Sequence, residues 1–215
     1  MPPPELSARI RAAVEAAPRP PTMRLGARLA FAMGAILLVM VVVALRMMRS
    51  DFAAIPTETF VTVTGAVVLL AIAGVLGAIL PGRRGLGPSV AVLLLVAVAV
   101  PILYVIVTNV APMHPPGVTP FSGNFLDRAW RCFGIECLVA LVGLGAFLFA
   151  LRGAVPVAPR VRGAALGAGA AAWAGLAGHM HCAWFDHGHL IVAHALPIAL
   201  FAAIGALVAP RIIKP

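Results

Sequence analysis

The chain has 215 residues, of which 62% are hydrophobic and only 11% are charged, and its mean hydropathy is +1.04. A soluble domain carries about a quarter charged residues, so this composition excludes a soluble globular protein. It also excludes a disordered chain, and three cysteines are too few for a disulfide-rich secreted scaffold. Sixteen Lys and Arg outnumber seven Asp and Glu, but they are scattered between apolar runs, which argues against direct nucleic-acid binding. We therefore expect an integral membrane protein.

Residues 1–24 are predicted to form a cytoplasmic N-terminal amphipathic segment. Prolines bound a helix over 5–17, and its apolar face contains Leu6, Ile10 and Val14, whereas Arg9 and Arg11 lie largely elsewhere. So short a helix needs a surface against which to bury its apolar face. Two interpretations remain open: a helix lying on the membrane surface, or a helix that binds in the groove of a cytoplasmic protein partner.

Residues 25–215 are predicted to form an all-α membrane domain, a bundle of six transmembrane helices. A spanning helix needs about 20 mostly apolar residues, and six segments meet or approach this length. They are residues 29–45, 59–80, 89–110, 133–151, 163–182 and 189–209. Pro101 and Pro197 lie inside two of these spans, where each removes a helical hydrogen bond and is expected to cause a kink.

The distribution of basic residues predicts the orientation of the bundle. With six spans, 12 Lys and Arg fall on the side that carries both termini, and four fall on the other side. These four are Arg46, Arg49, Arg128 and Arg131. Because basic residues are enriched in cytoplasmic loops, we expect both termini to lie in the cytoplasm.

Polar residues with metal-binding chemistry gather at the predicted outer face. Five of the six histidines fall within 16 residues, at His179, His181, His187, His189 and His194. Cys137 and Cys182 are expected at a similar depth, and Cys132 is expected in the loop above them. Thiols and imidazoles are transition-metal ligands, so the sequence suggests a metal or redox site. Its possible ligands are Cys137, Cys182, His179, His181 and His189. Incidental interfacial polarity is the alternative, because no standard zinc spacing such as C-x-x-C is present.

Small residues recur every four positions along the fifth predicted span, at Gly163, Gly167, Ala171 and Gly175. This spacing lets a neighbouring helix approach closely, and it leads towards His179 and Cys182. Motifs of enzymes are absent: there is no nucleophile elbow, no Walker loop, no H-E-x-x-H and no pair of carboxylates, so we do not expect an enzyme. A metal- or haem-binding membrane oxidoreductase, or a metal transporter, is kept as the alternative function.

The layout resembles that of the NrsF-type membrane anti-sigma factors. The resemblance rests on the short N-terminal helix, on Cys137 at the outer start of span four, and on Cys182 followed by His189 and His194-Ala195-Leu196-Pro197. It implies a protein of the bacterial inner membrane that sequesters an extracytoplasmic-function (ECF) sigma factor through the cytoplasmic N-terminal segment. It further implies that Cys137 and Cys182 sense metal or oxidative stress, with His189 and His194 beside them. The family pattern places a proline after the second cysteine, where this chain has Ala183.

Overall fold

The computed structural model describes residues 5–6, 8–9, 12, 25–80, 88–111, 113–117, 125–152 and 158–213. All regular structure in these residues is helical, which confirms the predicted all-α fold. The long helices are α2 (Leu25–Arg46), α3 (Thr57–Ile79), α4 (Val90–Val110), α5 (Phe125–Ala150) and α6 (Pro159–His181). A sixth continuous helical stretch comprises α7 (His187–His189), the π-helical segment η2 (Leu190–Ala195) and α8 (Leu196–Ile212). A short 3-10 turn, η1 (Phe52–Ala54), follows α2.

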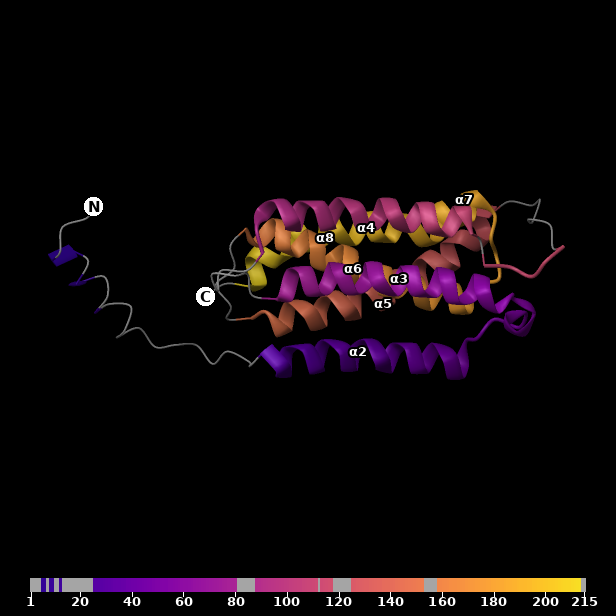
Figure 1. Ribbon diagram of the computed structural model, residues 1–215, viewed down its shortest axis with the longest axis horizontal. Helices are drawn as coiled ribbons and strands as arrows, with labels where there is room; N and C mark the ends of the chain where they lie inside the picture. The colour runs from indigo at the N-terminus through magenta and orange to yellow at the C-terminus, as the bar shows by residue number, and fades with distance from the viewer. Residues whose placement is uncertain are drawn as a thin grey trace.

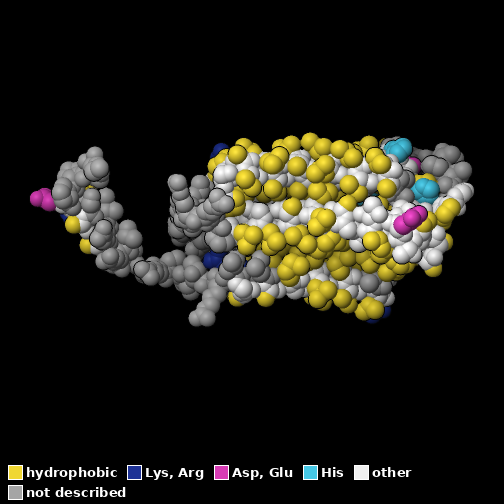
Figure 2. All heavy atoms as spheres, in the orientation of Figure 1, with side chains coloured by type: hydrophobic (Ala, Val, Ile, Leu, Met, Phe, Trp, Pro, Cys, Tyr) yellow, Lys and Arg dark blue, Asp and Glu magenta, His cyan; other side chains and the backbone are white. Residues whose placement is uncertain are grey.

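The long helices lie side by side along the long axis of the molecule (Figure 1). The start of α2 and the end of α8 lie at the same end of this bundle, which is the arrangement that an even number of passes produces. The middle of the visible surface is apolar, and the acidic and His side chains gather near one end of the bundle (Figure 2). Such a belt is the expected exterior of a helix bundle in lipid, where no water satisfies polar side chains.

Five of the helical stretches in the described part of the chain are long and apolar enough to cross a membrane, and they indicate a multi-pass membrane protein. They correspond to the first, second, third, fourth and sixth predicted spans. The fifth predicted span coincides with α6, whose Gly- and Ala-rich sequence is less apolar and is not among the five. Predicted boundaries were least accurate for α5, which begins at Phe125 and not at Phe133.

Helix α6 lies at the centre of the bundle, and nearly all its residues from Arg162 to His179 are buried. Its glycines permit backbone contact with neighbouring helices. A Cβ atom at Gly167 would overlap the backbone carbonyl of Phe201 in α8, and one at Gly169 would lie only 3.0 Å from the carbonyl carbon of Gly74 in α3. Further along, a Cβ at Gly175 would meet the phenol ring of Tyr104 in α4. The predicted small-residue spacing thus does allow close helix packing, on more than one side of α6.

Pro101 lies inside α4, which continues through it as one helix. Pro197 stands in the first turn of α8, directly after the π-helical segment. Proline cannot donate a backbone hydrogen bond, so the first turn of a helix tolerates it well. The change of helix type before Pro197 therefore sits where the regular hydrogen-bond ladder is already interrupted.

Candidate metal and thiol site

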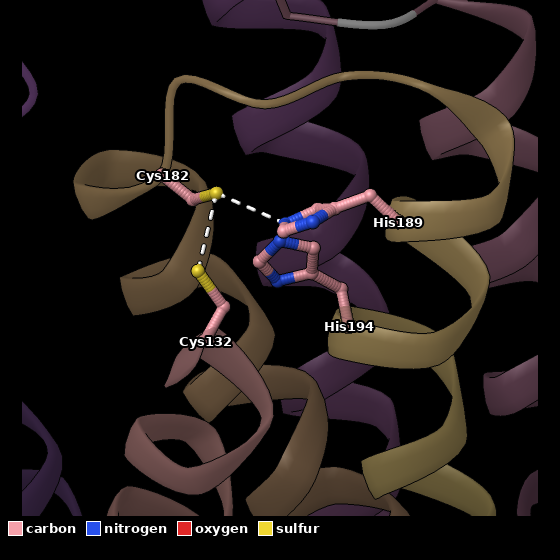
Figure 3. A group of neighbouring side chains, drawn as sticks. All are labelled: Cys132, Cys182, His189 and His194. Carbon is pink, nitrogen blue, oxygen red and sulfur yellow. Dashed lines mark hydrogen bonds between the residues drawn. The ribbon is translucent and has the colours of Figure 1, made fainter. Parts of the chain in front are cut away.

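Four buried side chains meet at the end of the bundle opposite the start of α2 (Figure 3). They are Cys132, Cys182, His189 and His194, and one donor atom from each lies within 4.8 Å of those of the other three. The two sulfur atoms are 3.3 Å apart, and the Cys182 sulfur lies 3.1 Å from Nε2 of His189. All three cysteines of the chain carry free thiols.

A fifth side chain, Glu136, supports this cluster from below. Its carboxylate contacts Nδ1 of His194, and both side chains are almost entirely buried. This contact uses one ring nitrogen of His194 and leaves Nε2 without a hydrogen-bond partner in the structure. A carboxylate behind an imidazole fixes its orientation and tautomer, an arrangement that commonly supports metal-binding histidines.

The position of α5 explains why Cys132 and Glu136 belong to the site whereas Cys137 does not. Residues four apart lie on one face of a helix, so Cys132 and Glu136 point the same way. Cys137, five residues after Cys132, is rotated by about 140° around the helix axis. It is half-buried and packs against the main hydrophobic core.

The π-helical segment places His189 and His194 together. Residues five apart in a regular α-helix are rotated by about 140° from one another. Hydrogen bonds of a π-helix join residues five apart, so the helix makes one turn between His189 and His194 and brings them to the same side. Their ring centroids are 5.2 Å apart. The stretch begins at a capped turn, where the Asp186 carboxylate accepts a hydrogen bond from the His189 backbone N–H at 2.8 Å.

The second cysteine is held by the end of α6. Cys182 caps this helix, and its backbone N–H donates to the Gly178 carbonyl at 2.6 Å. Gly178 is required here, because a Cβ atom would overlap the Glu136 carboxylate and crowd Nδ1 of His194. His179 also stands close to the cluster, with its ring stacked on that of His194 at 5.2 Å between centroids.

The structure therefore brings together three of the four residues predicted to sense the signal: Cys182, His189 and His194. The thiol that lies beside Cys182 is that of Cys132, whereas the sequence predicted Cys137 as its partner. Among the other predicted metal ligands, His179 is adjacent to the cluster, whereas Nδ1 of His181 contacts the Met47 carbonyl at the end of α2.

Sequence reasoning missed Cys132 because charged residues mark the start of α5 as a loop. Asp127, Arg128 and Arg131 lie within its first two turns, so the apolar run begins only at Phe133. The four-residue spacing of Cys132 and Glu136 is the signal that could have identified it. In the N-terminal segment, Leu6 and Arg9 are helical and exposed, and the predicted partner-binding residues Ile10, Arg11 and Val14 lie outside the described residues.

The donor set fits a soft or borderline transition-metal ion. Two thiols and two imidazoles are the ligands of many tetrahedral sites, in which neighbouring donor atoms are separated by about 3.3 to 3.8 Å. The cluster has this composition and a similar spacing. Two buried ring nitrogens, Nδ1 of His189 and Nε2 of His194, have no hydrogen-bond partner in the structure, and such groups are costly unless a ligand or water satisfies them.

Searches of curated proteins and of solved structures found no significant match. Residues 12–214 match the family described as NrsF, negative regulator of sigma F, whose members are non-enzymatic regulators. Because the match extends over nearly the whole sequence, this chain belongs to the NrsF family of negative regulators of sigma factors.

Proposed function

We propose that this chain is a membrane-bound anti-sigma factor that holds an ECF sigma factor and releases it when the buried Cys/His site reacts with a metal ion or an oxidant. The observation that supports this proposal is the close approach of four side chains at one end of a membrane bundle: Cys132, Cys182, His189 and His194. Structural packing does not require four such groups in contact, and polar groups inside membranes are expensive. The cluster is therefore a reactive centre and not part of an ordinary apolar core.

The proposed orientation puts this site on the outer side of the bacterial inner membrane. It rests on the 12-to-4 distribution of Lys and Arg and on six crossings, with α6 as the fifth. An alkaline phosphatase fusion at Pro116 should be active and one at Pro215 inactive, because this reporter folds only outside the cytoplasm. The opposite pair of activities would invert the topology and remove the basis for an external signal.

The chemical input at this site is binding or oxidation of two thiols. A soft metal ion would be held by Cys132 and Cys182 as thiolates, with loss of two protons, and by His189 and His194 as neutral imidazoles. A two-electron oxidant would instead accept two electrons and the two thiol protons as a bond forms between the sulfur atoms. Either event resets the separation between the start of α5 and the end of α6: a disulfide draws the two sulfur atoms together, and a metal ion holds them at a fixed distance.

The proposed output is the N-terminal segment, in which Leu6, Ile10 and Val14 form an apolar face that binds the sigma factor as a helix in a groove. Arg9 and Arg11 would contact acidic groups at the edge of that groove. Replacing Leu6, Ile10 and Val14 together by Ser should release the sigma factor and give high expression of its target genes without stress. If repression survives, the binding surface lies elsewhere, and residues 152–162, between α5 and the start of α6, are the next segment to test.

The decisive experiment compares single Cys→Ser variants in cells that carry a reporter driven by the sigma factor. Cys132→Ser and Cys182→Ser should abolish induction by soft metals and by oxidants while repression in unstressed cells is retained. Cys137→Ser serves as the matched comparison, because this thiol lies on the same helix but outside the cluster. If Cys137→Ser removes the response and Cys132→Ser does not, the originally predicted pair is the sensor.

Co-purification of the sigma factor with each variant separates sensing from binding. The Cys→Ser variants should retain the sigma factor in amounts equal to the unmodified chain. Loss of the sigma factor would show that the thiols stabilise the protein instead of reporting a signal. A double Cys132→Ser, Cys182→Ser variant that still responds normally to metals and oxidants would contradict the proposal.

A further inference from the structure

We infer that a cavity beside the two clustered thiols is a binding site for small oxyanions. The cavity has a volume of about 760 Å³ and opens at the same end of the bundle as the Cys/His site. Cys132 and Cys182 form part of its wall, so a bound molecule would lie next to both thiols. This inference concerns binding alone and does not depend on the proposed anti-sigma function.

The charge of the cavity wall points to an anionic ligand. Arg46, Arg49, Arg128 and Arg131 all line the cavity, and no Asp or Glu is among the described residues that do so. These are the only four basic residues that the sequence assigns to this side of the membrane. Cations that converge on one cavity repel one another, and a bound anion would relieve the repulsion between those that lack an acidic partner.

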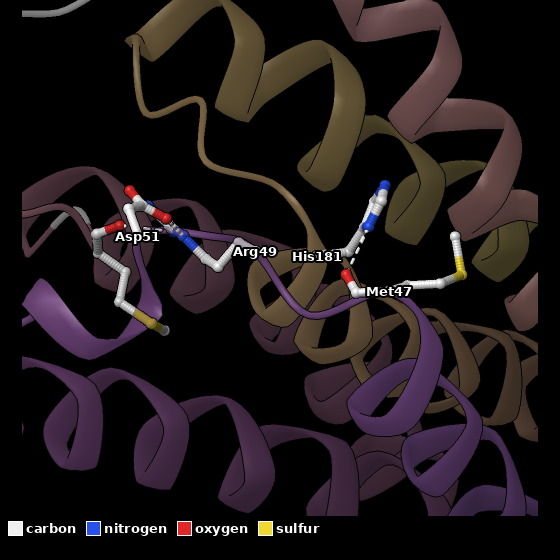
Figure 4. A network of polar contacts seen from close by, with 5 residues as sticks. Met47, Arg49, Asp51 and His181 are labelled. Atoms are coloured by element: carbon white, nitrogen blue, oxygen red, sulfur yellow. Dashed lines mark hydrogen bonds and ion pairs between the residues drawn. The ribbon is translucent and has the colours of Figure 1, made fainter.

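One of the four arginines is held rigidly and has its charge balanced. The Arg49 side chain is only 2% exposed and donates two hydrogen bonds, of 2.6 and 2.7 Å, to the two carboxylate oxygens of Asp51 (Figure 4). Its remaining terminal nitrogen donates to the Met113 carbonyl at 2.8 Å. The Arg49 guanidinium keeps the pKa of Asp51 below its usual value. Arg49 therefore builds the wall, and Arg46 and Arg131 are the cations that we assign to the ligand.

The other three arginines come from two helices, α2 and α5. Arg46 ends α2 and is exposed, and Arg131 lies exposed in the second turn of α5. Arg128 lies one turn before Arg131 on α5, with its guanidinium 3.7 Å from the centroid of the Trp184 ring. Guanidinium groups present forked donors that match the oxygens of phosphate or sulfate, so these residues suit a small oxyanion.

The same chemistry could come from a dissolved oxyanion or from the phosphate group of a lipid, because the cavity lies at one end of a membrane bundle. The test uses Trp184 as the only tryptophan, after Trp130→Phe and Trp173→Phe, in purified full-length protein. Iodide, an anionic quencher, should quench Trp184 more strongly than neutral acrylamide relative to free tryptophan. Inorganic phosphate at constant ionic strength should reduce quenching by iodide and leave quenching by acrylamide unchanged.

A charge variant and its matched control test the role of the arginines. Arg46→Gln with Arg131→Gln should lower the iodide quenching constant about three-fold, since the two cations assigned to the ligand are removed, and should remove the effect of phosphate. Arg152→Gln with Arg160→Gln changes the same charge at the opposite end of the bundle and should leave both unchanged. Equal effects of the two double variants, or iodide quenching that phosphate does not affect, would overturn the inference.

To distinguish a dissolved oxyanion from a lipid phosphate, the same quenching experiment is done in nanodiscs of phosphatidylcholine, with or without phosphatidylglycerol. If dissolved oxyanions are the ligand, phosphate should protect Trp184 from iodide equally in both membranes. If the ligand is a lipid phosphate, phosphatidylglycerol should already protect Trp184, and added phosphate should then have no further effect. Acrylamide quenching and helical circular dichroism should match across variants, so that a change in folding cannot be mistaken for a change in binding.

Discussion

Glu136 is the residue that most clearly separates this site from a simple pair of thiols. A carboxylate in the apolar part of a membrane bundle needs a compensating partner, and here its contact is Nδ1 of His194. The other carboxylate oxygen has no hydrogen-bond partner in the structure. Glu136 thus touches the site only through His194, so we assign it the role of a positioning residue that aims Nε2 of this histidine towards the thiols.

Glu136→Gln should weaken metal binding without removing it. An amide keeps the size and a hydrogen bond of the carboxylate but loses the negative charge that strengthens His194 as a ligand. Changes behind a metal ligand typically lower affinity roughly 10- to 100-fold. Titration of purified protein with Cd²⁺, followed by absorption of the metal–thiolate bond, measures this shift. Glu58→Gln, at the exposed start of α3, is the control and should bind as the unmodified chain does. Equal affinities of the two variants would remove Glu136 from the site.

At the scale of helices, α6 determines how closely the bundle can pack. Its glycines take the place of side chains at contacts with α8, α3 and α4. Gly167 is the clearest case, because the Phe201 carbonyl occupies the space that a methyl group would need. Backbone atoms cannot move aside as a flexible side chain can, so the two helices would have to separate. In membranes, where helices associate through close packing, such separation is directly destabilising.

Gly167→Ala should lower the thermal stability of the purified protein in detergent. Overpacking a tight contact typically costs about 1–3 kcal/mol, and here the added methyl group meets backbone atoms. Gly65→Ala in α3 is the matched control, since nothing lies within 4 Å of its added Cβ. This control should be neutral or slightly stabilising, because Ala favours helix more than Gly does. Equal melting temperatures for the two variants would show that α6 and α8 can separate without cost.

The π-helical segment η2 is a second feature at this scale, and its extra residue sets the register of His194. Inserting one Ala after Ile191, whose side chain is 48% exposed, should rotate His194 by about 100° relative to His189 and separate the two imidazoles. We expect loss of Cd²⁺ binding with helix content preserved by circular dichroism. Ile191→Ala, which keeps the register, serves as the control and should still bind Cd²⁺.

The sequence predicted most of the helices because composition and length suffice for an apolar span. It also located Cys182, His189 and His194, since five histidines close together are conspicuous in an apolar chain. It could not pair Cys132 with Cys182, because this pairing depends on where α5 starts. Charged residues such as Arg131 made the first two turns of α5 look like a loop in the sequence. It could not show the π-helical turn either, because local composition does not distinguish π- from α-helical hydrogen bonding.

For the whole molecule, an event at the thiols must reach the opposite end of the bundle, where α2 begins. The far end of α2 is tied to the residues just before Cys182. The Arg49 backbone N–H donates to the Met180 carbonyl at 3.0 Å, and Nδ1 of His181 lies 2.8 Å from the Met47 carbonyl (Figure 4). Elsewhere, α2 presents many large apolar side chains outward, including Leu37, Leu38 and Leu45. This helix can therefore move in lipid more readily than the buried α6.

We expect α2 to carry the signal as a rigid connection between the site and the N-terminal segment. Movement of Cys182 relative to Cys132 would shift Met180 and His181, and these would displace the residues that end α2. A helix transmits such a displacement along its axis with little loss, because its hydrogen bonds resist extension. The start of α2, which follows the proposed sigma-binding residues in the sequence, would then move relative to the rest of the bundle.

His181→Ala should therefore uncouple sensing from release. The imidazole contact with Met47 is lost, whereas the four clustered side chains remain in place, so metal binding should persist while induction of the reporter falls. His187→Ala is the matched control, because this histidine lies in the same region but contacts Asn109 of α4 and not α2. It should behave as the unmodified chain in both assays. Cd²⁺ titration of purified protein and reporter induction in cells must be measured on the same variants. If His181→Ala induces normally, or if it loses metal binding together with induction, the signal does not pass through this contact with α2.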